Sequence, residues 1–256
     1  MGRTGGMLVD LVSSHQNETS NEKEKPLMKR FLFYRMRKKM NINIHNHVIL
    51  SEAEMLRNLA DSAKLYSEYV DKDLLFIFRK NKNSDYEYVF IRCNHWNFMH
   101  LAGIRSKTLS AADFYDACLH QNIAKSDCTP SNNATSMYAK IAVMPNLMDL
   151  KKSKFYKIGE KDLITRDNDF VVAIGNGMGI IGYEEFDDNI NLNPKTLLTN
   201  PITYYSTNPQ KISFVLQKNG EERAYKKVIY EPKKGLCKQE LVHFSKEIQE
   251  MITIES

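Results

Sequence analysis

The sequence predicts an α+β fold with an N-terminal helix, an antiparallel sheet built of hairpins, and a C-terminal helix. Three pairs of strand-like runs are each separated by a short polar linker, which is typical of hairpins. Segments of helical period lie before and after these pairs, and helices segregated from an antiparallel sheet define the α+β class. We expect the α+β domain over residues 48–235, a partly disordered basic and polar extension over 1–47, and a C-terminal helix over 236–256.

The N-terminal extension carries the net positive charge of the chain. Residues 1–50 hold nine Lys/Arg and four Asp/Glu, and subtracting these from the totals of 36 and 31 leaves 27 of each. Residues 1–27 are polar without apolar periodicity, which predicts a mobile tail. Residues 28–40 mix basic and aromatic side chains, as do segments that bind RNA or an acidic membrane surface. The alternative, which we favour, is a peripheral element whose lysines and arginines face water.

The first half of the domain is predicted to contain a helix, a hairpin and a second helix. Ser51–Glu54 fits a capping box at the start of a helix that runs to about Tyr69. Strands are expected over Asp73–Lys80 and Tyr86–Cys93, joined by the polar linker NKNSD. A second helix is expected over Ser110–His120, with its serine as the N-cap.

The second half is predicted to consist mainly of strands. Met137–Met144 alternates with period two, which would place Tyr138 and Lys140 on one face of a strand. Pro194 takes the first position of an expected short helix, PKTLL, and a final helix begins near Lys238. Two further hairpins, each with an Asn-Gly bend, are expected from Phe170–Gly175 with Gly179–Glu184 and from Lys211–Lys218 with Ala224–Glu231.

Composition and motif spacing argue against several classes of protein. No apolar run approaches the roughly 20 residues of a membrane helix, and the short run Met7–Val12 does not make a signal peptide. We therefore expect a cytoplasmic protein without a membrane span. The four cysteines lack CxxC spacing, which argues against a structural zinc site and a disulfide framework. The His45–His47 pair has no second pair of ligands nearby in sequence, so we expect no metal and no cofactor.

One stretch, Asn94–Leu119, carries the strongest candidate for chemistry. It contains His95, His100 and the only tryptophan, Trp96. A histidine that follows a strand and precedes the small-residue turn Ala102-Gly103 can present its imidazole at the edge of a sheet, as a general acid or base must. The alternative for His100 is a half-buried histidine that is hydrogen-bonded to the backbone.

Four short motifs follow one another between about residues 70 and 232. The first is FMHLAGI, which contains His100 and is followed by SAADFYDACL. The second lies in Ala134–Met148, and the third and fourth are GIIGY from Gly179 and PKTLL from Pro194. In this order the motifs resemble the phage-associated branch of the Barnase–EndoU–colicin–RelE-like (PBECR) nucleases.

The resemblance implies a BECR-like core whose sheet face carries a metal-independent ribonuclease site, often in toxins of phages and mobile elements. The ribose 2′-hydroxyl attacks the adjacent phosphate there, which requires a base, an acid and a cation. His100 matches the family histidine, as acid or base, and Lys140 matches the family lysine that would stabilise the phosphate. Further candidates are Thr135 and Thr196 as catalytic hydroxyls, and Tyr138, Ser136 and Lys195 as substrate-binding residues.

Departures from the family pattern keep a second hypothesis open. Several nucleases of this class use two histidines, and His95, the nearest second one, lies in no matched motif. Ala102 stands where a hydroxyl residue is usual, and Lys140 fits a solvated lysine equally well. A metal-dependent hydrolase would need a carboxylate cluster, and the nearest, in 184–188, fits a solvated loop. The first hypothesis is an enzyme that acts on RNA and has an antitoxin or another protein partner. The alternative is a catalytically inactive binding module of the same fold that acts through contacts with a partner protein.

Overall fold

The structure, a computed structural model, describes residues 48–79, 81, 83–151, 170–185, 191–205 and 209–254, together with the backbone of 157–160. The predicted N-terminal tail, the basic and aromatic segment and the His45–His47 pair lie outside these residues. Within the described ranges, no helix has both the length and the apolar character needed to cross a membrane.

The described helices are mostly short, and two of them begin at the predicted caps. At the start of α2, Ser51 Oγ accepts from the backbone N–H of Glu54 at 3.3 Å, and Glu54 Oε2 accepts from the backbone N–H of Ser51 at 2.9 Å. This reciprocal pair is the predicted capping box. Ser110 caps α4 through the backbone N–H of Asp113 at 3.2 Å. The helices are α2 (Glu52–Tyr66), α3 (Asn97–Leu101), α4 (Ala111–Leu119), α5 (Ala134–Met148), α6 (Ile202–Tyr205), α7 (Leu236–Glu240) and α8 (Lys246–Met251), with 3₁₀ turns η1 (Lys125–Asp127) and η2 (Leu241–His243).

Eight described strands form one curled sheet whose pairings return to the first strand. The order is β1-β2-β8-β7-β6-β5-β9-β10, and β1 also pairs with β9, so that only β10 of these strands stands outside the ring. All pairs are antiparallel except β2 with β8. A separate pair, β3 (Ile104–Arg105) with β4 (Thr129–Pro130), is also antiparallel. The strands of the large sheet are β1 (Lys72–Phe78), β2 (Glu87–Arg92), β5 (Lys157–Glu160), β6 (Val172–Gly175), β7 (Ile180–Glu185), β8 (Asn191–Leu198), β9 (Gln210–Asn219) and β10 (Lys227–Tyr230).

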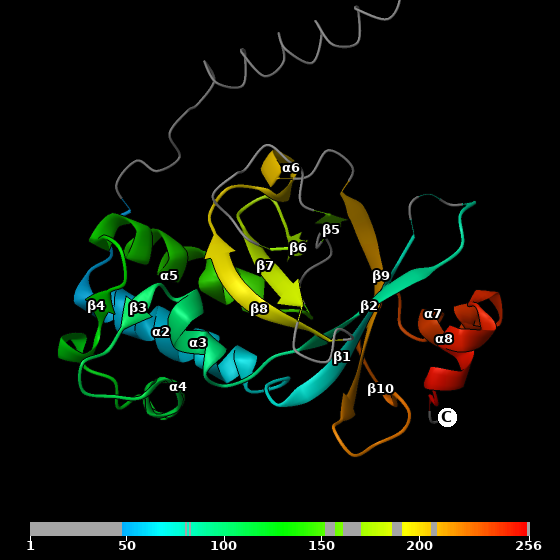
Figure 1. Cartoon of the computed structure of the whole chain (residues 1–256), viewed down its shortest axis with the longest axis horizontal. Helices are drawn as coiled ribbons and strands as arrows, with labels where there is room; N and C mark the ends of the chain where they lie inside the picture. The colour runs from blue at the N-terminus through cyan, green and yellow to red at the C-terminus, as the bar shows by residue number, and fades with distance from the viewer. Residues whose placement is uncertain are drawn as a thin grey trace, which may run out of the picture. The chain divides into compact units, whose positions relative to one another are not determined.

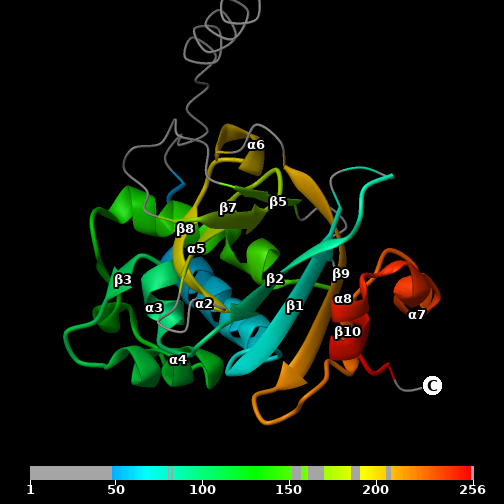
Figure 2. The ribbon, with the colours of Figure 1, turned by 45° about the vertical axis from the view of Figure 1, so that its right-hand side comes forward.

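Strand β1 is buried on both faces because a different layer covers each one. Leu74 and Phe76 belong to the larger core cluster, which includes the apolar sides of α2, α4 and α5. Leu75 and Ile77 belong to a second cluster with Phe244 and other C-terminal residues. Figures 1 and 2 both show α2 to α5 on one side of the sheet and α7 and α8 on the other. Because successive side chains of a strand point to opposite faces, β1 contributes side chains to both core clusters.

The predicted α+β class is confirmed, together with its three hairpins. The pairs β1–β2, β6–β7 and β9–β10 are each antiparallel. Each hairpin joins two strand-like runs rich in apolar side chains, with a polar linker between them.

The predicted strand over Met137–Met144 is wrong, because this segment lies within helix α5. Asn133 is the N-cap, and its Oδ1 accepts from the backbone N–H of Ser136 at 2.8 Å. Pro145 lies in the last turns of the helix and removes one N–H donor there. The buried positions recur at intervals of three and four, which is the helical period: Met137, Ile141, Met144, Leu147 and Met148.

The predicted helix at Pro194 is also wrong, because PKTLL completes strand β8. Gly182 of β7 lies opposite Thr196, whereas the next residue, Tyr183, lies opposite Pro194. Lys195 is therefore the extra residue of a β-bulge. Proline cannot donate to the ladder and is tolerated at such a bulge.

The predicted single C-terminal helix is divided into α7, η2 and α8. Phe244 has an extended backbone, with φ −76° and ψ 157°, which ends the helical run. Ser245 then starts α8 by accepting from the backbone N–H of Ile248 at 3.3 Å. Phe244 and Ile248 nevertheless pack on the sheet as the apolar spacing requires.

Candidate active site

Helix α3 carries His100, and the side chain of Asn97 joins this helix to β8. Asn97 Oδ1 accepts from the backbone N–H of Asn94 at 3.0 Å, and Asn97 Nδ2 donates to the carbonyl of Pro194 at 3.1 Å. Phe98 on the same helix is fully buried, whereas His100 lies on the exposed side. The short helix therefore holds the imidazole beside the bulged part of β8.

Gly103 ends this helical turn and makes room for Lys140. It adopts φ +70°, a left-handed conformation that glycine adopts at little cost, and its N–H donates to the carbonyl of His100 at 2.9 Å. A Cβ atom at this position would lie 3.0 Å from Lys140 Cδ and 3.7 Å from Lys140 Nζ. The lysine stem therefore crosses directly over the glycine, and its ammonium group stands beside the loop that follows His100.

The pKa of His100 is lowered, first because packing removes water from around the imidazole, and second because Lys140 is close enough to repel a second positive charge. Glu184 opposes this effect, Arg105 adds to it, and a backbone hydrogen bond with Lys195 raises the pKa again. Burial also lowers the pKa of Lys140. The neutral imidazole is thus favoured beside an ammonium group that gives up its proton more readily than a solvated lysine.

Two strands and the bulge complete the surroundings of His100. Glu184 on β7 and Lys195 on β8 form an ion pair, with 2.5 Å between Oε2 and Nζ. Arg105 lies on β3 opposite Thr129 and is exposed. Two cationic side chains, Lys140 and Arg105, and the carboxylate of Glu184 therefore act on the imidazole, and the Glu184–Lys195 ion pair lies beside them. Such an arrangement suits an anionic ligand such as a phosphate.

The structure brings three of the predicted site residues together, namely His100, Lys140 and Lys195, through the interactions described above. Thr196 follows Lys195 on β8 and lies opposite Gly182.

Three predicted residues of α5 lie at different angles around the helix axis. Ser136 lies one turn before Lys140 and on the same side of the helix. Thr135, in the exposed first turn, is rotated from Lys140 by about 140°. Tyr138 is rotated by about 200° and packs against the larger core cluster. The predicted shared face of Tyr138 and Lys140 is therefore wrong, because it assumed a strand.

The family comparison covers all of these residues. Residues 58–234, more than half of the chain, match the family model described as phage-Barnase-EndoU-ColicinE5/D-RelE like nuclease4 (PBECR4). The chain belongs to this nuclease family. The resemblance read from the four ordered motifs is thereby confirmed. No curated protein and no solved structure matches the chain.

Within the PBECR4 match, two site residues escaped the sequence reasoning. Glu184 ends the predicted strand Gly179–Glu184 and lies in β7 as expected, but its carboxylate was interpreted only as part of the solvated acidic run 184–188. Arg105 directly follows the HLAGI motif, but no periodicity marks the two-residue strand that positions it.

His95, the second histidine of the stretch, has a different environment. Its Nδ1 lies 3.2 Å from Asp71 Oδ2, and its ring meets Trp96 edge to face, with 4.9 Å between ring centroids. Asp71 has a positive φ of 55°. His100, in contrast, lies near Lys140, Arg105 and Glu184, so the two histidines have different neighbours.

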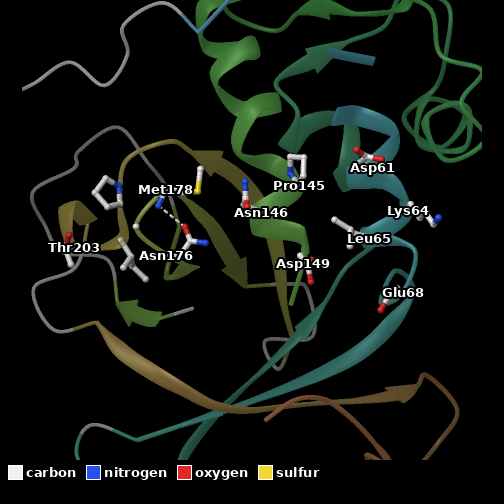
Figure 3. Close-up of a pocket in the computed structure, with 13 residues that line it drawn as sticks. Asp61, Lys64, Leu65, Glu68, Pro145, Asn146, Asp149, Asn176, Met178 and Thr203 are labelled. Carbon is white, nitrogen blue, oxygen red and sulfur yellow. Dashed lines mark hydrogen bonds between the residues drawn. The ribbon is translucent and has the colours of Figure 1, made fainter. Parts of the chain in front are cut away.

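A cavity of about 900 Å³ lies elsewhere, between α2, the end of α5, the β6–β7 turn and α6. Figure 3 shows Asn176 and Met178 of that turn facing residues of α5 and α2 across it. None of the predicted site residues lines this cavity. The His100 cluster is therefore separate from this cavity.

Metal-ligating side chains do not gather into a site within the described part of the chain. There, no cluster of three or more His, Cys, Asp or Glu is arranged to hold a metal ion. All four cysteines are buried and free, and burial raises the pKa of Cys93 to about 12. Such cysteines behave as small apolar side chains of the core.

Proposed function

We propose that this protein is a metal-independent, toxin-like ribonuclease. In this proposal His100 and Lys140 catalyse the attack of a ribose 2′-hydroxyl of the RNA on the adjacent phosphate. The observation that carries the proposal is that His100, whose lowered pKa favours the neutral imidazole, lies near the partly buried Lys140. Both residues are inside the region that matches a nuclease family. The pairing supplies a proton acceptor and a cation at one place, which is what this reaction demands.

The proton transfers follow from the pKa directions. His100 accepts the proton of the 2′-hydroxyl, because its lowered pKa keeps the imidazole neutral near pH 7. The 2′-oxygen attacks the phosphorus, and the bond between the phosphorus and the 5′-oxygen breaks. Lys140, whose pKa is lowered by burial, supplies a proton to the leaving oxygen. The products are a 2′,3′-cyclic phosphate and a free 5′-hydroxyl.

The remaining charged residues hold the phosphate. Arg105 adds positive charge near the histidine, and arginine binds phosphate oxygens in a planar, two-pronged geometry. Glu184 pairs with Lys195 at 2.5 Å and thereby fixes the lysine on the bulge. In the cell we expect the substrate to be RNA, and an antitoxin or another protein partner to restrain the enzyme.

The test is cleavage of labelled total RNA in the presence of excess chelator. The wild-type protein is compared with His100→Ala and with His243→Ala, a control histidine that is exposed and lies outside the family match. We expect cleavage with cyclic phosphate ends by wild type and His243→Ala, and a loss of about 100-fold or more for His100→Ala.

Three other outcomes contradict parts of the proposal. Cleavage that stops in chelator would contradict metal independence. Equal cleavage by His100→Ala and wild type would refute the site. An absence of cleavage by every variant would instead favour the catalytically inactive binding module, for which the single histidine in the cluster is the supporting observation.

A further inference from the structure

Trp96 is an exposed tryptophan placed one helical turn before His100. It is the only tryptophan of the chain, and 48% of its surface is exposed. Trp96 is the N-cap of α3 and has helical dihedral angles, φ −69° and ψ −18°. Residues four apart on a helix lie on the same side, with about 5–6 Å between their Cβ atoms. The indole is therefore a neighbour of the imidazole on the surface of the helix.

The indole is held in place although its surface is open. The backbone on either side of it is fixed, since Asn97 N–H donates to the carbonyl of Asn94 at 3.0 Å and Phe98 N–H donates to that of His95 at 3.2 Å. His95 meets the ring at an interplanar angle of 77° and is itself oriented by Asp71. Nearly half of the Trp96 surface, 48%, is open to solvent beside this edge-to-face contact, and a flat ligand can bind there.

A purely structural role does not account for this arrangement. Tryptophan contributes most to stability when its large apolar surface is buried, and the burial of α3 is achieved by Phe98 and Leu101, both 0% exposed. The exposed part of the indole therefore adds little to the packing of α3 and is open to a ligand. The charges that surround the neighbouring His100 are mainly positive, namely Lys140 and Arg105, which favours a polyanion with flat rings.

We propose that Trp96 is the stacking platform for an unpaired base of the RNA, next to the phosphate that lies at His100. The inference rests on the proposed function and names its substrate class as single-stranded RNA, because a base inside a duplex cannot lie flat on a side chain. Stacking on an aromatic ring tolerates any base. In this proposal Lys140 and Arg105 bind the phosphate backbone of the RNA, while the indole stacks on one base.

The experiment uses the full chain with His100→Ala, so that RNA is bound without being cut. A short single-stranded oligoadenylate is titrated while the tryptophan fluorescence is recorded, and all of that signal comes from Trp96 because the chain has no other tryptophan. Affinity is measured in parallel by anisotropy with the same RNA carrying a dye. Trp96→Ala and Trp96→Phe are then introduced into the His100→Ala protein.

Tyr204 provides a matched control. It is also 48% exposed and also makes one edge-to-face contact with its chain neighbour, Tyr205, at 5.1 Å between centroids, but it lies on α6. We expect RNA to quench the fluorescence, Trp96→Ala to raise Kd about 5- to 150-fold, the range for one lost base stack, and Trp96→Phe to raise it less. Tyr204→Ala should change Kd by less than about twofold.

The outcomes separate this inference from the proposed function. Quenching together with a weakened Trp96→Ala, in a protein whose wild type cuts no RNA, would support the platform and refute the ribonuclease. Cleavage by wild type together with unquenched fluorescence and an unchanged Kd for Trp96→Ala would refute the platform alone. Preference for a duplex of the same length over the single strand would also overturn it. Circular dichroism spectra identical to wild type establish that each variant is folded.

Discussion

Replacing Gly103 with alanine tests how the backbone after α3 makes room for Lys140. Gly103 has φ +70°, and an alanine Cβ there would lie 3.0 Å from Lys140 Cδ. Two effects are therefore combined in one substitution, a backbone cost and a displaced lysine.

The two effects have different magnitudes and consequences. An L-residue in the left-handed region costs about 1–2 kcal/mol, which corresponds to a fall in Tm of roughly 2–8 °C for a domain of this size. The 3.0 Å contact involves the middle of a flexible side chain, so Lys140 can yield by a few tenths of an ångström. That movement costs little stability, but it displaces the ammonium group from the phosphate, where small misplacements reduce catalysis strongly.

Two other glycines separate these effects. Gly235 also has a positive φ, +78°, but a Cβ added there would meet nothing within 4 Å, and Gly220 has neither a positive φ nor a neighbour in that range. In urea unfolding followed by circular dichroism, we expect Gly103→Ala and Gly235→Ala to lose about 1–2 kcal/mol and Gly220→Ala less than about 0.5 kcal/mol. In the RNA cleavage assay, only Gly103→Ala should lose activity.

Two results would refute this reasoning. If Gly103→Ala is as stable as Gly220→Ala, the left-handed conformation carries no cost and the backbone argument fails. If Gly103→Ala loses stability like Gly235→Ala but retains full cleavage, the position of Lys140 against the glycine does not matter for the reaction.

Two further predictions concern charge. An NMR titration should place the pKa of His100 below its ordinary value of 6.5, so that the neutral base, and with it kcat/KM, is lost as pH falls through that lowered pKa. Lys140→Met should raise the pKa of His100, because the substitution removes a repelling positive charge. An unchanged titration midpoint in Lys140→Met would contradict this prediction. Asp73→Asn should cost about 1.5–3 kcal/mol in urea unfolding, because this buried carboxylate accepts from Arg92 Nε at 2.7 Å. Glu222→Gln, which removes the carboxylate of a partly exposed pair with Lys226, should lower the free energy of unfolding less than Asp73→Asn does. Equal losses for the two variants would show that burial does not set the difference.

Much of the fold could be predicted wherever a local pattern has a single physical solution. The capping box at Ser51 leads into α2 as expected, because both of its hydrogen bonds are made within one turn of chain. The hairpin β1–β2 also follows from short-range pattern and linker.

The failures occur where a local pattern had two solutions. The alternating run at Met137 fits a strand, but burial against α2 and the rest of the core selects a helix. Pro194 fits the first turn of a helix equally well as a bulge, and the partner strand β7 decides for the bulge. In each case the energy of tertiary packing exceeds the small local preference.

In the candidate site, too, the residues within contiguous motifs could be predicted, and those that depend on tertiary contacts could not. His100 and Lys140 were found as motif residues, and Lys195 as part of PKTLL, because each lies in a contiguous matched motif. Glu184 and Arg105 were missed as site residues, since their relevance comes only from proximity to His100 across separate strands. Tyr138 was misplaced because its side depends on whether the segment is a helix or a strand.

The sequence by itself determined the α+β class, the hairpins, the helices capped by Ser51 and Ser110, and the nuclease family, because these depend on periodicity, caps and ordered motifs along the chain. The tertiary structure alone decided that β1 is buried from both sides, that β8 bulges at Lys195, and that a lysine of α5 crosses over Gly103 toward His100. Proximity between distant residues is set by how layers pack and not by any local spacing. The electrostatic environment of His100 therefore exists only in the folded chain.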